Sequence, residues 1–153
     1  MMHFFNGLVA AEKLLKNYHG LQRAIKTLDQ RISRLVARAA PRPLRAAVIE
    51  EMIRARGRQD DALNLLFEIK GLTDARAETQ LEIERIESAL EAISRPPACQ
   101  FYGPVLRLWY IEKLPKHEIA QEIGYSSRQT IYDIRNAALR QFAVEIFGIR
   151  GMV

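Results

Sequence analysis

The residues of this sequence that are best suited to chemistry lie between Lys116 and Arg140, and they are suited to polar recognition. An arginine side chain can donate to guanine O6 and N7, a glutamine matches adenine N6 and N7, and an aspartate can accept from cytosine N4. Helical spacing from Arg128 onward would place such side chains on one face and apolar ones on the other. The candidate contact residues are Lys116, Arg128, Gln129, Tyr132, Asp133, Arg135, Asn136 and Arg140.

The order of these residues along the helix predicts different roles. Arg128 and Gln129 stand in the first turn and are expected to meet base edges in the major groove of double-stranded DNA. Tyr132, Asp133 and Asn136 follow about one turn later as second contacts. A single exposed polar side chain is most often only solvated, so the prediction depends on the face that these residues share.

The basic residues further along the helix are expected to reach phosphates rather than bases. Arg135 and Arg140 fall in this class, together with Lys116 and His117 at the start of the preceding helix. Because phosphate contacts fix orientation without reading sequence, these residues would position the helix on the duplex.

The element that must carry the contact residues is a helix, a turn and a second helix. Gly124 can end the first helix in the left-handed conformation, and Ser126 or Ser127 can cap the second; the sequence leaves that choice open. This order predicts a helix-turn-helix, although an ordinary helical hairpin that binds nothing has the same spacing. The predicted buried faces are Ile119, Ala120 and Ile123 on the first helix and Ile131, Ile134, Ala138 and Phe142 on the second.

Length and composition fit an ordinary folded protein with a basic balance. The chain has 153 residues, 48% of them hydrophobic and 27% charged, and a formal net charge of +5. A basic balance suits nucleic acid, and equally a membrane surface or an acidic protein. Cys99 is the only cysteine, which excludes an intrachain disulfide and favours a reducing, cytoplasmic setting.

Other classes of protein find little support in the sequence. No run approaches the roughly eighteen apolar residues of a membrane span, so no membrane partner is expected. The histidines are scattered and there is no glycine-rich phosphate loop. We therefore expect neither an enzyme nor a protein with a metal or another cofactor.

Two long heptad helices are predicted in the N-terminal half. From about residue 6 to 39, and from about 60 to 94, apolar residues alternate spacings of four and three, the seam of a coiled coil. Arg76 takes the one missing seam position. The first segment is basic, with Glu12 and Asp29 as its only acids, and the second is acidic. The seams are Leu14, Tyr18, Leu21, Ile25, Leu28, Ile32 and Leu35, and Leu65, Ile69, Leu72, Thr79, Ile83, Ile86, Leu90 and Ile93.

Opposite charge predicts that the two segments pair with each other. They could do so within the chain, as an antiparallel hairpin, or between chains in a homo-oligomer such as a dimer or tetramer, and the sequence leaves both arrangements open. Residues 44–59, between the segments, are expected to form a short helix or a loop that reverses the chain.

Two successive prolines, Pro96 and Pro97, predict the boundary between two domains because they cannot continue a helix. Residues 1–95 would form a coiled-coil-like oligomerisation region. Residues 96–153 would form a DNA-binding domain, in which a helix from Phe101 to Lys113 packs across the helix-turn-helix. The predicted fold is all-α: a long N-terminal helical hairpin followed by a three-helix domain.

The segment from Phe101 to Phe142 resembles region 4 of bacterial sigma factors. The residues that carry the likeness are Leu106, Tyr110, Leu114, Glu118, Ile119, Ala120, Ile123, Gly124, Ser127, Ile131, Ala138 and Leu139. With a helical N-terminal half of this length, the chain is similar to the ArpU/RinA group of phage late-transcription activators. The resemblance implies sequence-specific activation of late phage genes in a bacterial host. Pro115, in place of a polar capping residue, and Asp133, an acid on the reading face, depart from the pattern.

Two other functions remain open on the sequence. A small terminase-like phage packaging protein also joins a helix-turn-helix to a coiled coil, and it assembles into rings. A protein-interaction module would instead bind host RNA polymerase or a sigma factor without DNA. Sedimentation distinguishes a ring from a dimer or tetramer, and duplex binding at low salt distinguishes the interaction module from a DNA-binding protein.

Overall fold

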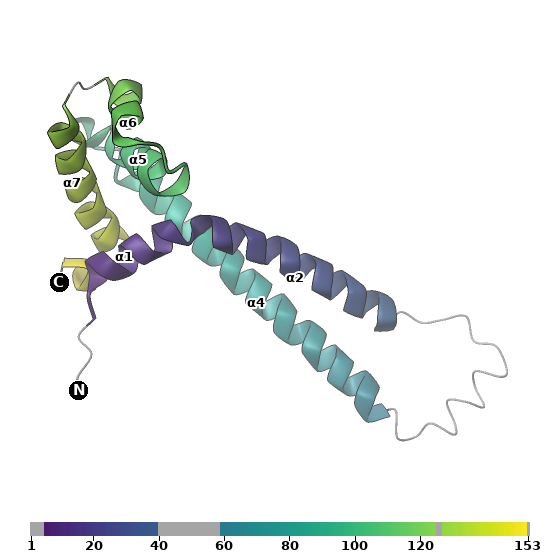
Figure 1. The fold of residues 1–153 in the computed structure, drawn as a ribbon. Coiled ribbons are helices and arrows are strands. Elements are labelled where there is room, and N and C mark those ends of the chain that lie inside the picture. Colours follow the sequence, from purple (N-terminus) through teal and green to yellow (C-terminus); the bar gives the residue numbers. More distant parts are fainter. Residues whose placement is uncertain (1–4, 40–58, 125–126, 153) are drawn as a thin grey trace. The chain divides into compact units, whose positions relative to one another are not determined.

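The computed structural model describes residues 5–39, 59–124 and 127–152, and the regular secondary structure in these ranges is helical (Figure 1). The all-α fold class is therefore confirmed. None of the helices in these ranges combines the length and the apolar character that a membrane span requires. Contacts divide the chain into two units: residues 1–22 with 81–153, and residues 23–80.

The predicted domain boundary at residues 95 and 96 lies inside the first of these units. Helix α1 (Gly7–Lys16) packs on α7 (Arg128–Phe147), although the sequence grouped it with the coiled coil. Its Leu15 and Ile86 of α4 (Gln59–Ala92) are fully buried in this unit. Burial of apolar side chains therefore groups the N-terminal helix with the C-terminal helices.

The predicted helix from residue 6 to 39 forms as two helices that meet at Asn17. Asn6 caps α1, because its side chain accepts hydrogen bonds from the backbone N–H groups of Leu8 and Val9, each at 3.1 Å. Asn17 ends α1, and its carbonyl accepts from Leu21 N–H of α2 (Tyr18–Ala39) at 2.9 Å. Asparagine is weak inside helices because its side chain competes for backbone hydrogen bonds, which accounts for a break at this residue.

Within the described ranges, the second unit consists of the parts of α2 and α4 that lie side by side (Figure 1). The predicted seam positions here are partly shielded from solvent, and Leu35 is buried. Arg76, the exception in the seam, forms an ion pair with Asp29, and its Nη2 also lies 3.4 Å from the second carboxylate oxygen. An exposed pair contributes only about 0.2–1 kcal/mol, so its main effect is on register. The coiled-coil pairing stays a prediction, and residues 44–58 lie outside the described ranges.

The predicted helix from Phe101 to Lys113 forms as α5 (Tyr102–Leu106) followed by a π-helical turn, η3 (Arg107–Ile111). The backbone N–H of Glu112 donates to the Arg107 carbonyl at 2.9 Å, five residues back instead of four. Such wide turns change the direction in which side chains point. Here the consecutive residues Trp109 and Tyr110 both contact side chains of α7.

Helices α6 (Lys116–Ile123) and α7 share a small apolar core. Ile119, Ala120 and Ile131 are buried in it, and Leu108, Trp109, Leu114 and Ile123 pack against them. Further along α7, Ala138 and Phe142 are fully buried and Ile134 is half-buried. The predicted apolar faces of both helices therefore match their packing. Two short 3-10 segments lie outside this core: η2 (Pro97–Cys99) precedes α5, and η4 (Gly148–Met152) follows α7.

Candidate nucleic-acid interface

The turn after α6 is closed by Gly124, as the sequence predicts. Gly124 has φ 90° and ψ 18°, the left-handed region, and its N–H donates to the Ala120 carbonyl at 2.9 Å. A side chain at this φ is strained, which is the physical reason for glycine here. Ser127 occupies the N-cap position of α7 without a side-chain capping hydrogen bond. Ser126, the other predicted cap, lies outside the described residues.

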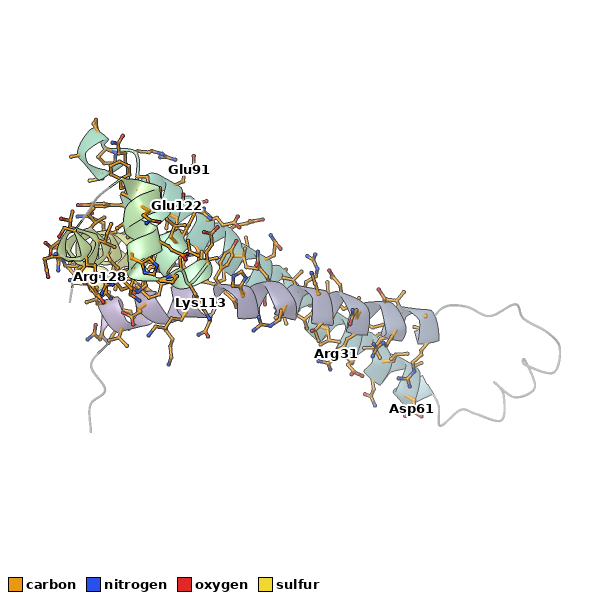
Figure 2. The ribbon with its side chains drawn as sticks, turned by 45° about the horizontal axis from the view of Figure 1, so that its top comes forward. Arg31, Asp61, Glu91, Lys113, Glu122 and Arg128 are labelled. Atoms are coloured by element: carbon orange, nitrogen blue, oxygen red, sulfur yellow. The ribbon has the colours of Figure 1, made fainter. Side chains whose placement is uncertain are left out.

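The first three turns of α7 carry an exposed polar face. Its opposite side is anchored by Ile131 and Ala138, which are fully buried. Figure 2 shows Arg128 at the beginning of the helix. Six of the eight candidate contact residues have exposed side chains: Arg128, Gln129, Tyr132, Asp133, Asn136 and Arg140.

Asp133, the acid that departs from the family pattern, is bonded to a neighbour on the same face. The side-chain Nε2 of Gln129 donates to Asp133 Oδ1 at 3.0 Å, across one helical turn. An amide has two N–H donors and a carbonyl acceptor. The bond to Asp133 therefore uses one N–H and leaves Gln129 with one donor and its acceptor.

Arg135 takes an inward position, which differs from the outward one that the spacing predicts. Its side chain is only 20% exposed, and its Nη1 donates to the Tyr110 hydroxyl at 3.1 Å and lies 3.9 Å from a carboxylate oxygen of Glu12. The Tyr110 hydroxyl donates in turn to that carboxylate at 3.2 Å. Because a guanidinium gains from a carboxylate and a phenol together, the side chain turns toward α1 and η3 and away from solvent. Its Nε has no hydrogen-bond partner among the described residues.

Glu12 is the carboxylate on which this network depends. Lys16 lies 2.6 Å from Glu12 on the next turn of α1, and its hydrogen bond is the largest influence that lowers the pKa of the Glu12 carboxyl. Partial burial opposes this effect, while Tyr110 and Arg135 add to it. Burial raises the pKa of the Tyr110 phenol, so that the phenol stays a donor. A chain of polar contacts thus runs from Lys16 through Glu12 and Tyr110 to Arg135, and it joins α1, η3 and α7. We call it the Glu12 network.

Trp109 forms an aromatic and cationic cluster with three of the candidates, Tyr132, Lys116 and Arg135. Its ring meets Tyr132 edge-on, with centroids 5.0 Å apart and planes at 80°. Lys116 Nζ lies 4.3 Å from the centroid of the indole and Arg135 Cζ lies 4.6 Å from it. Each such contact is worth about 0.5–1 kcal/mol when partly exposed. Lys116, predicted to reach a phosphate, is therefore half-buried against an indole ring.

Sequence reasoning missed Trp109, Tyr110 and Glu12 as parts of this site. Each had a signal that could have drawn attention. Trp109 is the only tryptophan, and Glu12 is one of only two acids in the basic segment from residue 6 to 39. The spacing of residues along the sequence did not indicate that Trp109, Tyr110 and Glu12 contact Arg135, because Arg135 is more than twenty positions from each of them.

Comparisons of this chain with protein-family models, with curated proteins and with solved structures find no match. Its function is therefore inferred from its own residues and geometry. Within the described ranges, no group of three or more His, Cys, Asp or Glu side chains is arranged to hold a metal ion. The exposed face of α7 presents hydrogen-bond donors, hydrogen-bond acceptors and one aromatic ring, that of Tyr132.

Proposed function

We propose that this chain is a sequence-specific DNA-binding transcriptional regulator. Helices α6 and α7 would act as a helix-turn-helix whose second helix enters the major groove with its N-terminal turns first. The observation that carries the proposal is the exposed polar face of α7 directly after the glycine turn, backed by a buried apolar face. The net charge of +5 suits a polyanionic partner.

Arg128 and Gln129 are the leading readers of sequence. Both are exposed in the first turn, where recognition helices contact base edges. A glutamine recognises adenine by accepting from N6 and donating to N7, so it needs one acceptor and one donor. The hydrogen bond to Asp133 leaves Gln129 with that pair and holds its amide in one orientation. Asp133 is thus assigned a positioning role, and Tyr132 and Asn136 remain second contacts.

Arg135 and Lys116 are assigned a supporting role in place of phosphate contacts. Both cations lie over Trp109, and Arg135 is also bonded into the Glu12 network. These contacts brace α7 against α1 and η3, which favours a fixed presentation of the reading face. Arg140 is exposed and keeps its predicted role at a phosphate.

The resemblance to sigma region 4 and to the ArpU/RinA group supports a more specific version of the proposal. On that basis the regulator activates late phage genes in the cytoplasm of a bacterial host, with host RNA polymerase as a second partner. It is a binding protein and not an enzyme.

Selection of bound sites from random duplex DNA tests the proposal directly, because it requires no known operator. We expect an enriched motif, and half-sites repeated in it would indicate a symmetric oligomer. Arg128→Ala should then reduce discrimination between the selected site and a scrambled duplex by roughly 5- to 150-fold, which corresponds to about 1–3 kcal/mol for one base contact.

The matched control is Arg150→Ala, which removes an equal charge from an exposed arginine of η4. It should lower affinity for both duplexes to a similar small extent and leave discrimination unchanged. Enrichment of no motif, or equal discrimination by the two variants, would contradict the assignment of α7 as a reading helix. Failure to bind any duplex at low salt would favour the protein-interaction module instead.

A further inference from the structure

The start of α4 carries more apolar surface than one neighbouring helix can cover. Between residues 63 and 69, α4 carries five large apolar side chains: Leu63, Leu65, Leu66, Phe67 and Ile69. At 100° per residue they span roughly 200° of the helix circumference, about twice the stripe that packs on a single partner. The seam residues among them are partly shielded, whereas Leu63, Leu66 and Phe67 are 50%, 56% and 62% exposed. We call these three residues the α4 patch.

The same unit leaves further apolar surface uncovered. Val36 of α2 is 49% exposed. A hollow of about 750 Å³ lies between the end of α2 and the start of α4, and it is lined by Ala39, Ala62, Leu65 and Leu66 with charged side chains around it. Among the described residues of this unit, Leu35 is the one large side chain that is buried. Since helix pairs derive their stability from such burial, the unit needs another surface to pack on.

The net charges of the α2 and α4 segments indicate what kind of surface would cover the α4 patch. Residues 23–39 of α2 hold five basic side chains and one acidic one, a net charge of +4, whereas residues 61–80 of α4 hold four acidic and two basic ones, a net charge of −2. Within the described part of the unit, one ion pair joins the two helices, that of Arg76 with Asp29. It pairs a base of the mainly acidic α4 segment with the one acid of the mainly basic α2 segment. The majority charges, including Arg34 and Arg38 and also Asp61 and Glu68, remain exposed.

We propose that the α4 patch is covered by α2 of a second copy of this chain. A two-fold axis makes the contact reciprocal, so that α2 of each copy packs on α4 of the other. In the resulting four-helix bundle, each basic segment lies between two acidic ones, and Val36 meets the α4 patch of its partner copy. Packing α4 directly on α4 would instead bring like charges together. This inference goes beyond the DNA contact proposed above and does not depend on it.

The molar mass of the full chain in solution, with a pair of matched variants, tests the proposed surface. Sedimentation should give a dimer of about 35 kDa, twice 17.5 kDa. Leu66→Glu places a charge in the α4 patch and should give a monomer. Leu81→Glu changes an equally exposed leucine of the same helix outside the patch, and should leave the dimer intact. A monomeric wild type, or a Leu66→Glu variant that stays dimeric, would overturn the proposal.

Charge reversal tests the identity of the partner, and it remains decisive if Leu66→Glu fails to fold. One variant carries Arg34→Glu with Arg38→Glu, and the other carries Asp61→Lys with Glu68→Lys. Each alone opposes like charges across the proposed interface and should be monomeric, whereas an equimolar mixture should form dimers through two attractive contacts. A mixture that stays monomeric while wild type dimerises would refute α2-to-α4 exchange between copies. A wild type that is monomeric at every concentration would mean that other residues of the same chain cover the patch.

Discussion

Replacing Tyr110 by phenylalanine should destabilise the protein by removing one hydroxyl from the Glu12 network. Tyr110 is buried, and its hydroxyl donates to Glu12 at 3.2 Å and accepts from Arg135 at 3.1 Å. A hydrogen bond to a charged group contributes about 1.5–3 kcal/mol. Both bonds are long and Glu12 keeps Lys16, so we expect the lower half of that range, about 1.5–2 kcal/mol.

Denaturant and thermal unfolding followed by helical circular dichroism measure this change. A loss of 1.5–2 kcal/mol should lower the midpoint by about 3–8 °C for a chain of this length. Tyr132→Phe is the matched control, because Tyr132 is exposed and its ring contact with Trp109 survives the change. That variant should stay within about 0.5 kcal/mol of wild type.

The result that would refute the reasoning is equal stability of the two tyrosine variants. A double-mutant cycle sharpens the test. If Tyr110→Phe and Glu12→Gln act on one network, their combined effect should differ from the sum of the single effects by about 0.5 kcal/mol or more. Additive effects would show that Glu12 and Tyr110 stabilise the protein independently.

Two further outcomes follow from local geometry. Apart from local backbone and chain neighbours, a Cβ at Gly124 or at Gly71 would meet no atom of the described residues within 4 Å, but Gly124 alone of the two has a positive φ. Gly124→Ala should therefore lower the free energy of unfolding by about 1–2 kcal/mol. Gly71→Ala, inside α4, should raise it by about 0.5–1 kcal/mol in the same assay. Changes of the same sign in the two variants would contradict this account. Burial and the hydrogen bond to Glu87 raise the pKa of Tyr18 to about 12. A raised pKa stabilises the fold below the unfolded pKa near 10, so wild type should lose roughly 2 kcal/mol of unfolding free energy between pH 10 and 12 relative to Tyr18→Phe. Parallel curves for the two proteins would refute this.

Much of the helical layout follows from the sequence because its causes are local. Heptad spacing indicated which side of α2 and α4 is shielded, since side chains three and four positions apart share a face. Gly124 was predictable as a left-handed cap because backbone preference depends on the residue itself. Helical spacing likewise made the exposed and buried sides of α7 predictable, apart from Arg135.

The candidate site was only partly predictable. Arg128 and Gln129 are exposed in the first turn as expected. The hydrogen bond from Gln129 to Asp133 agrees with their i, i+4 spacing on a helix, but sequence reasoning did not predict it. Lys116 was assigned to a phosphate because it is a basic residue at the start of the first helix of the motif. The nearby indole of Trp109 changes its environment, and only packing brings that ring within reach.

By itself, then, the sequence determined most of the helical segments, the faces that most of them bury and, apart from Arg135, which candidate residues are exposed on α7. The tertiary structure decided that α1 belongs with the C-terminal helices, that Arg135 turns inward to Tyr110 and Glu12, and that the α4 patch is exposed within the described part of the chain. The physical reason is distance along the chain. Glu12 and Arg135 are brought together because α1 packs on α7, where Leu15 and Phe142 are fully buried, and no periodicity encodes a contact between residues so far apart.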